Sequence, residues 1–142
     1  MTLGSIRHQI RIRRSADDVW ARVRDAAGLH TWFPGLTDCQ VDGNNRVIFL
    51  ASGMAMPEEI LLIDDVQRRF QYRITAPIFR HHRGTIDVIE LGSDECMVVY
   101  STEADPRTMA LTIGGGTAGA LDELQRQLEA PLAANPEENG AH

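Results

Sequence analysis

The feature that most constrains the fold is a change of hydrophobic period at Asp105-Pro106. Before it, residues 36–103 form six short segments with strand-like patterns, divided by turn-forming residues. After it, apolar residues recur at helical spacing from Met109 to Leu128, and charged residues cover the opposite side. A run of strands followed by one long amphipathic helix predicts a sheet whose apolar face is covered by that helix.

The six strands are expected at residues 37–41, 46–52, 58–65, 70–76, 83–91 and 96–103. Asp42-Gly43-Asn44-Asn45 and Gly92-Ser93-Asp94 are typical of hairpin turns. Connections this short favour antiparallel neighbours over parallel crossover units.

A seventh strand precedes these six, because residues 5–14 alternate between two faces. One face holds Ile6, His8, Ile10 and Ile12, and the other holds arginines and a glutamine. Ser15-Ala16-Asp17-Asp18 has the pattern of a helix N-terminus, and two short helices are expected before Pro34-Gly35. The predicted fold class is α+β: a seven-stranded curved antiparallel sheet wrapped around a long C-terminal helix, with two short helices between strands 1 and 2. We expect an apolar cavity between this sheet and the helix.

Length and composition favour one domain. With 142 residues, 43% of them apolar, the chain can bury a core without disulfides or metals. We expect residues 1–130 to form a single domain and residues 131–142 to be a disordered polar tail. No segment approaches the roughly 20 apolar residues of a membrane span, and the first residues do not resemble a signal peptide. We therefore expect a cytoplasmic protein without stable membrane insertion.

The charged and sulfur-containing residues exclude several kinds of chemistry. All 14 basic residues are arginines, so Schiff-base, pyridoxal phosphate and P-loop lysine chemistry is excluded. Cys39 and Cys96 form no metal-ligand pattern and are expected to be free thiols, and neither a metal nor a cofactor is predicted. The net charge of −6, without a platform of aromatic residues among the arginines, disfavours nucleic-acid binding. Nothing in the sequence opposes a homodimer.

A glycine-rich segment at residues 114–119, Gly-Gly-Gly-Thr-Ala-Gly, matches the letters of the dinucleotide-binding fingerprint. That fingerprint needs a following strand and an acidic residue about 20 positions further on within a βαβ unit, but only 23 residues follow Gly119 and they end in a polar tail. We expect these glycines instead to soften or kink the long helix and to allow it to move over the cavity.

Four segments together resemble the START-related superfamily, in its polyketide cyclase/dehydratase and lipid-transport branch. They are residues 15–20, Trp32-Phe33-Pro34-Gly35, the Asp64-Asp65 turn with residues 69–73, and the closing helix. The resemblance spans about residues 5–130 and implies a helix-grip fold with a hydrophobic ligand, such as a lipid, a quinone or a polyketide-like molecule, between sheet and helix. It leaves open the alternative of a cofactor-independent cyclase or dehydratase. The superfamily has no common catalytic signature, so the resemblance assigns no catalytic residue.

Two titratable residues are candidates for acid/base chemistry. His8 interrupts an isoleucine face and should point inward, where an imidazole can exchange protons with a ligand. Glu58 and Glu59 precede an apolar run, and alternation requires that one of them faces the core. Which one depends on the register; we expect Glu59. The alternatives are a histidine satisfied by its neighbours and a carboxylate in solvent or beside an arginine.

The candidates for ligand contact are aromatic and flexible apolar residues. Two tyrosines lie in the middle of strands, and several rings and thioethers lie in helix ends or connections, where core residues are less expected. With two residues of the long helix, the set is Trp32, Phe33, Met54, Met56, Tyr72, Phe79, Tyr100, Met109 and Ile113. Ordinary core packing is the competing interpretation for each. The segment Arg80-His81-His82-Arg83 is expected at a solvated hairpin tip, with an anion or headgroup gate as the functional alternative.

Overall fold

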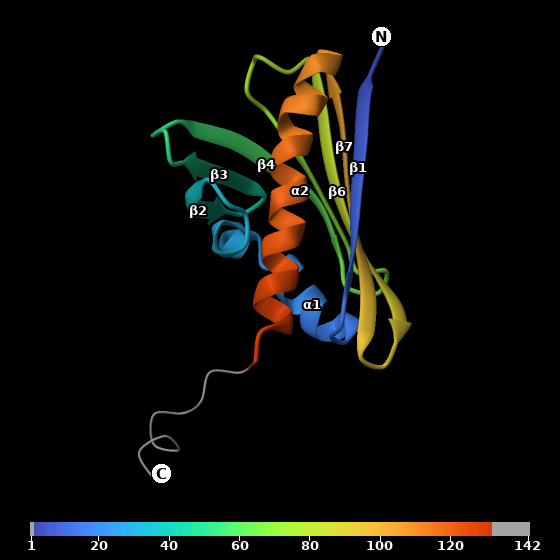
Figure 1. Cartoon of the computed structure of the whole chain (residues 1–142). Coiled ribbons are helices and arrows are strands. Elements are labelled where there is room, and N and C mark those ends of the chain that lie inside the picture. The colour runs from blue at the N-terminus through green and yellow to red at the C-terminus, as the bar shows by residue number, and fades with distance from the viewer. Residues whose placement is uncertain (1, 132–142) are drawn as a thin grey trace, which may run out of the picture.

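One antiparallel sheet wraps around a long helix in the computed structural model, which describes residues 2–131 (Figure 1). The sheet has seven strands in the order β1-β7-β6-β5-β4-β3-β2. The elements are β1 (Gly4–Ile12), α1 (Ala16–Val23), η1 (Ala26–Thr31), β2 (Leu36–Asp42), β3 (Asn45–Leu50), β4 (Ala55–Asp64), β5 (Arg69–Ile74), β6 (His81–Gly92), β7 (Glu95–Asp105) and α2 (Arg107–Glu129). The predicted fold class is confirmed. The predicted disorder of the tail concerns residues 132–142, which lie outside the described residues.

The first strand joins the sheet beside the last one. β1 pairs with β7 in antiparallel register, from Gly4 opposite Ala104 to Ile12 opposite Cys96. Its inward-facing residues are the predicted ones, and β1 packs against α2. The other strands are joined to their neighbours along the chain as hairpins, so β1–β7 is the long-range pairing of the sheet.

The glycines of α2 allow close packing. α2 runs as one helix from Arg107 to Glu129, through all of the glycines that were expected to soften it. A Cβ atom on Gly114 would lie 2.6 Å from Cγ2 of Ile6, and one on Gly116 would lie 3.2 Å from Cε1 of Phe33. The helix therefore approaches β1 and the segment after η1 more closely than a larger residue would permit.

Two strands begin two or three residues earlier than the sequence predicts. β4 starts at Ala55 and β6 at His81, so Met56 and His82 lie in strands and not in connections. His82 is buried, which corrects the prediction of a solvated hairpin tip for that residue. Cys39 and Cys96 are free, buried thiols, as predicted. In the part of the chain that the structure describes, we find no helix long and apolar enough to cross a membrane.

Candidate functional site

A cavity of about 250 Å³ lies between the sheet and α2. α2 contributes residues spaced three and four positions apart, which places them on one face of the helix. The opposite wall comes from inward-facing residues of β3, β4 and β5, and the segments around η1 and before β6 complete it. The lining residues are Leu29, Phe33, Leu36, Ile48, Leu50, Met56, Glu58, Tyr72, Ile74, Phe79, Met109, Thr112, Ile113 and Gly116.

A buried ion pair stands at the sheet wall of this cavity. Arg46 on β3 and Glu58 on β4 are register partners, and Arg46 Nε donates to Glu58 Oε1 at 2.7 Å. Both side chains are only 2% exposed. Burial raises the pKa of Glu58 above its ordinary value, and the Arg46 guanidinium opposes this rise. The result is a carboxylate whose charge is compensated from one side within an apolar wall.

The guanidinium of Arg46 is held in place by three further contacts. Nη1 donates to the backbone oxygen of Ala26 at 3.1 Å, and Cζ lies 5.0 Å from the ring centroid of Tyr72 and 5.3 Å from that of Phe70. Such cation–π contacts favour a charged group over the face of a ring. Arg46 is not among the lining residues, so it supports Glu58 from behind.

Two phenols form the next polar pair on the inner face. The hydroxyl oxygens of Tyr72 and Tyr100 lie 2.5 Å apart, and both side chains are buried. Burial raises the pKa of both tyrosines well above 10, so both stay protonated at neutral pH. The Tyr72 ring fits because its neighbour on β6 is Gly84, where a Cβ atom would lie 2.5 Å from Cε1 of that ring. Tyr72 reaches the cavity and Tyr100 lies behind it.

His82 fills the gap where β5 and β6 separate. Register pairs between these strands end at Tyr72 and Gly84, and beyond this point Ile74 N donates to Nδ1 of His82 at 2.9 Å. Nδ1 is therefore the unprotonated nitrogen, and burial lowers the pKa of His82 to about 4. Its Nε2 is buried and has no hydrogen-bond partner among the described residues.

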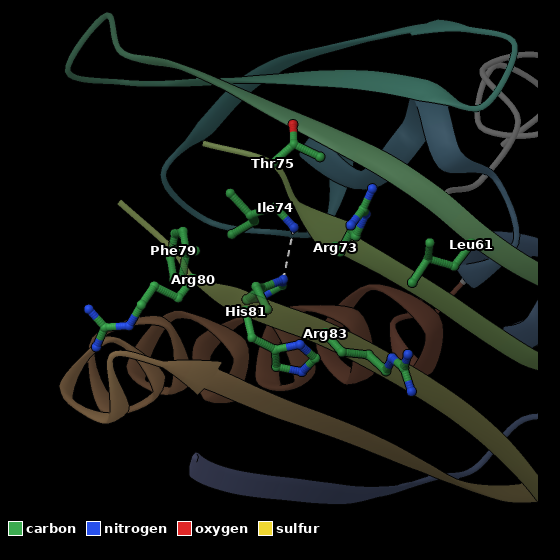
Figure 2. Close-up of a pocket in the computed structure, with 9 residues that line it drawn as sticks. Leu61, Arg73, Ile74, Thr75, Phe79, Arg80, His81 and Arg83 are labelled. Atoms are coloured by element: carbon green, nitrogen blue, oxygen red, sulfur yellow. Dashed lines mark hydrogen bonds between the residues drawn. The ribbon is translucent and has the colours of Figure 1, made fainter. Parts of the chain in front are cut away.

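A second pocket, of about 390 Å³, opens beside this gap (Figure 2). Ile74 and Phe79 line both this pocket and the apolar cavity. Its arginines, Arg73, Arg80 and Arg83, point in different directions in Figure 2. Arg80 pairs with Asp105 at 2.7 Å, and Arg73 pairs with an exposed glutamate. The arrangement therefore does not gather the cations around one point, as an anion site would.

Comparison with known proteins identifies the family. Residues 4–131 match the sequence profile of the family described as polyketide cyclase / dehydrase and lipid transport. The chain belongs to this family. The resemblance of the four sequence segments is thereby confirmed. A comparison with curated proteins gives no match.

Solved structures share the fold of this polyketide cyclase/dehydrase and lipid-transport family member. An uncharacterised protein from Bacillus thuringiensis is 20% identical, with a TM-score of 0.81, and the match covers 89% of this chain and 100% of that one. A point mutant of norcoclaurine synthase from Thalictrum flavum, solved with a transition-state analogue, is 19% identical with a TM-score of 0.72, and the match covers 89% of this chain and 94% of that one. A START superfamily protein from Mycobacterium smegmatis is 12% identical with a TM-score of 0.71, and the match covers 87% of this chain and 98% of that one. At these identities the likeness concerns the fold alone.

Most of the predicted ligand-contact residues gather at the cavity. The structure places Phe33, Met56, Tyr72, Phe79, Met109 and Ile113 in its lining. Trp32 and Tyr100 are buried just outside it, with ring centroids 6.4 Å apart. Met54 does not join them: it follows the turn after β3, and 57% of it is exposed to solvent. Contact of these residues with a ligand stays a prediction.

The predicted acid/base pair is not brought together. His8 faces inward on β1 as expected, and its Nε2 is buried without a hydrogen-bond partner among the described residues, but it does not line the cavity. The expectation for Glu59 is wrong: it lies on the outer face, where Arg73 Nη2 donates to Glu59 Oε2 at 2.7 Å. Ile60 faces inward on β4, and alternation then places Glu58 inside. Three strands, β7, β6 and β5, lie between β1 and β4 in the sheet.

Sequence reasoning missed Arg46, and it considered His82 only as part of an anion or headgroup gate at a hairpin tip. Arg46 lies two and four positions before Ile48 and Leu50 on the same strand, and both of these residues line the cavity. Because side chains alternate along a strand, this spacing predicts that Arg46 also faces inward. For His82 the parity with Gly84, Ile86 and Val88 carried the same signal. Within residues 2–131, no group of three or more histidine, cysteine or acidic residues could hold a metal ion.

Proposed function

We propose that this protein binds a small hydrophobic molecule in the cavity between the sheet and α2. The observation that supports this most is the cavity itself, which is lined by aliphatic and aromatic side chains and contains one carboxylate and one phenol in its sheet wall. Binding sites for small molecules commonly combine an apolar wall with a few polar groups. The family also includes lipid transport in its description.

The size of the cavity favours a compact ligand. Its volume of about 250 Å³ lies below the range of about 300–1,000 Å³ that is usual for drug-sized ligands. A bicyclic aromatic molecule buries an area similar to that of a large aromatic side chain, about 200 Å². At roughly 25 cal/mol per Å², this contributes about 5 kcal/mol before the costs of association. A small quinone or an aromatic polyketide fragment therefore fits better than a long-chain lipid held inside completely.

Native mass spectrometry and a blocked cavity test the proposal together. Freshly purified protein is analysed as isolated and after addition of a fatty acid, menadione and 2-naphthol. Ile113→Trp places an indole in the cavity, and Leu111→Trp, on an exposed position of the same helix, is the matched control. We expect a bound molecule in the wild type and in Leu111→Trp, and none in Ile113→Trp. An empty wild-type protein that ignores every probe would refute the proposal.

A second candidate function is acid/base catalysis on the bound molecule, as in a cyclase or dehydratase. It is favoured by the buried Glu58, whose pKa is raised, in the same wall as the Tyr72 hydroxyl. The carboxylate would remove a proton next to a carbonyl group, and the phenol would donate a hydrogen bond to the resulting enolate oxygen. Glu58 replaces Glu59 as the base in this proposal.

Hydrogen–deuterium exchange tests for catalysis without knowledge of the substrate. The probe is 2-tetralone, a bicyclic ketone, in D₂O, and NMR follows loss of the protons next to its carbonyl group. Catalysis by Glu58 predicts faster exchange with the wild type than with Glu58→Gln. Equal rates for the two proteins would leave binding as the function.

The cytoplasmic location, the homodimer and the absence of nucleic-acid binding stay predictions.

A further inference from the structure

The polar side-chain atoms of the cavity wall differ in how many hydrogen bonds they already make within the protein. Three lining residues carry oxygen atoms in their side chains: Glu58, Tyr72 and Thr112. Thr112 Oγ1 donates within α2 to Thr108 O, and the Tyr72 hydroxyl bonds to Tyr100. Glu58 accepts one hydrogen bond, at Oε1, and within residues 2–131 its Oε2 receives none. A carboxylate has room for about four donors, so Glu58 retains most of its capacity as an acceptor.

The cation that compensates Glu58 lies on the side away from the cavity. Arg46 is not a lining residue, and its contacts with Glu58, Ala26 and two aromatic rings hold the guanidinium in place. Among residues 2–131, a ligand in the cavity therefore meets a hydrogen-bond acceptor in the wall and no accessible cation. The ion pair as a whole is neutral, so it offers little net attraction to a charged ligand.

We infer that the ligand of this cavity is a mainly apolar molecule with a neutral hydroxyl group, an alcohol or a phenol, that donates a hydrogen bond to the Glu58 carboxylate; this inference rests on the proposed binding function. A hydrocarbon leaves the acceptor unsatisfied, which costs free energy in an apolar wall. A carboxylic acid brings a like charge next to Glu58. A hydroxyl group supplies the missing donor without adding charge.

Three naphthalenes of the same ring size test this selectivity. Isothermal titration calorimetry compares 2-naphthol, 2-methylnaphthalene and 2-naphthoate on the full chain. Hydrogen bonds to charged groups predict that 2-naphthol binds at least tenfold more tightly than 2-methylnaphthalene. We expect 2-naphthoate to bind most weakly. Equal affinities of 2-naphthol and 2-methylnaphthalene, or tightest binding of 2-naphthoate, would overturn the inference and leave the binding function standing. If none of the three binds, the inference is refuted, and the native mass spectrometry of the protein as isolated and with the fatty acid and menadione decides the binding function separately.

Two neighbouring glutamates provide a matched pair of variants. Glu58→Gln keeps the shape of the side chain and removes the anionic acceptor, and Glu59→Gln makes the same change on the outer face. We expect the preference for 2-naphthol to fall to about one in Glu58→Gln and to be unchanged in Glu59→Gln. An unchanged preference in Glu58→Gln contradicts the assignment. If Glu58→Gln does not fold, the wild-type series decides the question by itself.

Discussion

Replacing Arg46 with methionine should destabilise the protein strongly. Arg46 and Glu58 are each 2% exposed, and the atoms of the ion pair are 2.7 Å apart. Arg46→Met leaves the Glu58 carboxylate buried without its counter-ion, which costs about 3–5 kcal/mol in comparable buried pairs. It also removes the hydrogen bond to Ala26 O. For a chain of this size, we expect the melting temperature to fall by roughly 10–20 °C.

Urea denaturation, followed by tryptophan fluorescence, measures this change as a free energy of unfolding. Two controls separate charge burial from loss of packing. The double variant Arg46→Met/Glu58→Met removes both charges and should recover to within about 1–2 kcal/mol of the wild type. Arg73→Met breaks the exposed pair with Glu59 and should cost less than about 1 kcal/mol. Two results would refute the reasoning that Glu58 is a buried carboxylate that needs Arg46 as its counter-ion. One is a decrease in the free energy of unfolding of less than about 1 kcal/mol in Arg46→Met, and the other is a double variant no more stable than the single one.

Three further predictions concern His82, Gly84 and the cavity. The pKa of His82 is lowered from 6.5 to about 4 in the folded protein, so on acidification the unfolded chain is protonated at His82 before the folded protein is. The neutral His82 therefore contributes stability above pH 6.5, and the free energy of unfolding should fall by about 3 kcal/mol as the pH is lowered from 6.5 towards 4. His82→Gln keeps an acceptor for Ile74 N and should flatten this part of a stability–pH curve, whereas His81→Gln should not. Gly84→Ala places a Cβ atom against the Tyr72 ring and should cost about 1–3 kcal/mol in urea denaturation, whereas Gly92→Ala, with open space around it, should be neutral to within about 0.5 kcal/mol. At ten times its dissociation constant, 2-naphthol should stabilise the wild type by about 1.4 kcal/mol in a thermal-shift assay and leave Ile113→Trp unchanged.

Much of the architecture is encoded locally. The alternation from Ile6 to Ile12 and the helical spacing from Met109 to Leu128 are properties of short stretches, and both predicted their elements correctly. The turn at residues 42–45 likewise joins β2 and β3 as an antiparallel hairpin. Met109 and Ile113 were found for the same reason, because the face on which a helical residue lies follows from its spacing.

The register of β4 was beyond local reasoning. Residues 60–63 are all apolar, so they do not show which parity faces the core. The structure resolves the ambiguity through neighbours that are distant in the chain: Ile60 lies opposite Tyr72, and a bulge follows before Leu62 pairs with Gln71. This register turns Glu58 inward towards Arg46 and leaves Glu59 outside with Arg73.

By itself, the sequence determined the order of the elements and the apolar character of the face between sheet and helix, because periodicity and turn chemistry depend on adjacent residues. Only the tertiary structure decided which polar groups stand at the cavity. The ion pair of Arg46 and Glu58, the phenol pair of Tyr72 and Tyr100, and the insertion of His82 between β5 and β6 each join separate strands. Such contacts depend on register and on the close approach that Gly84 permits, which are properties of the assembled sheet.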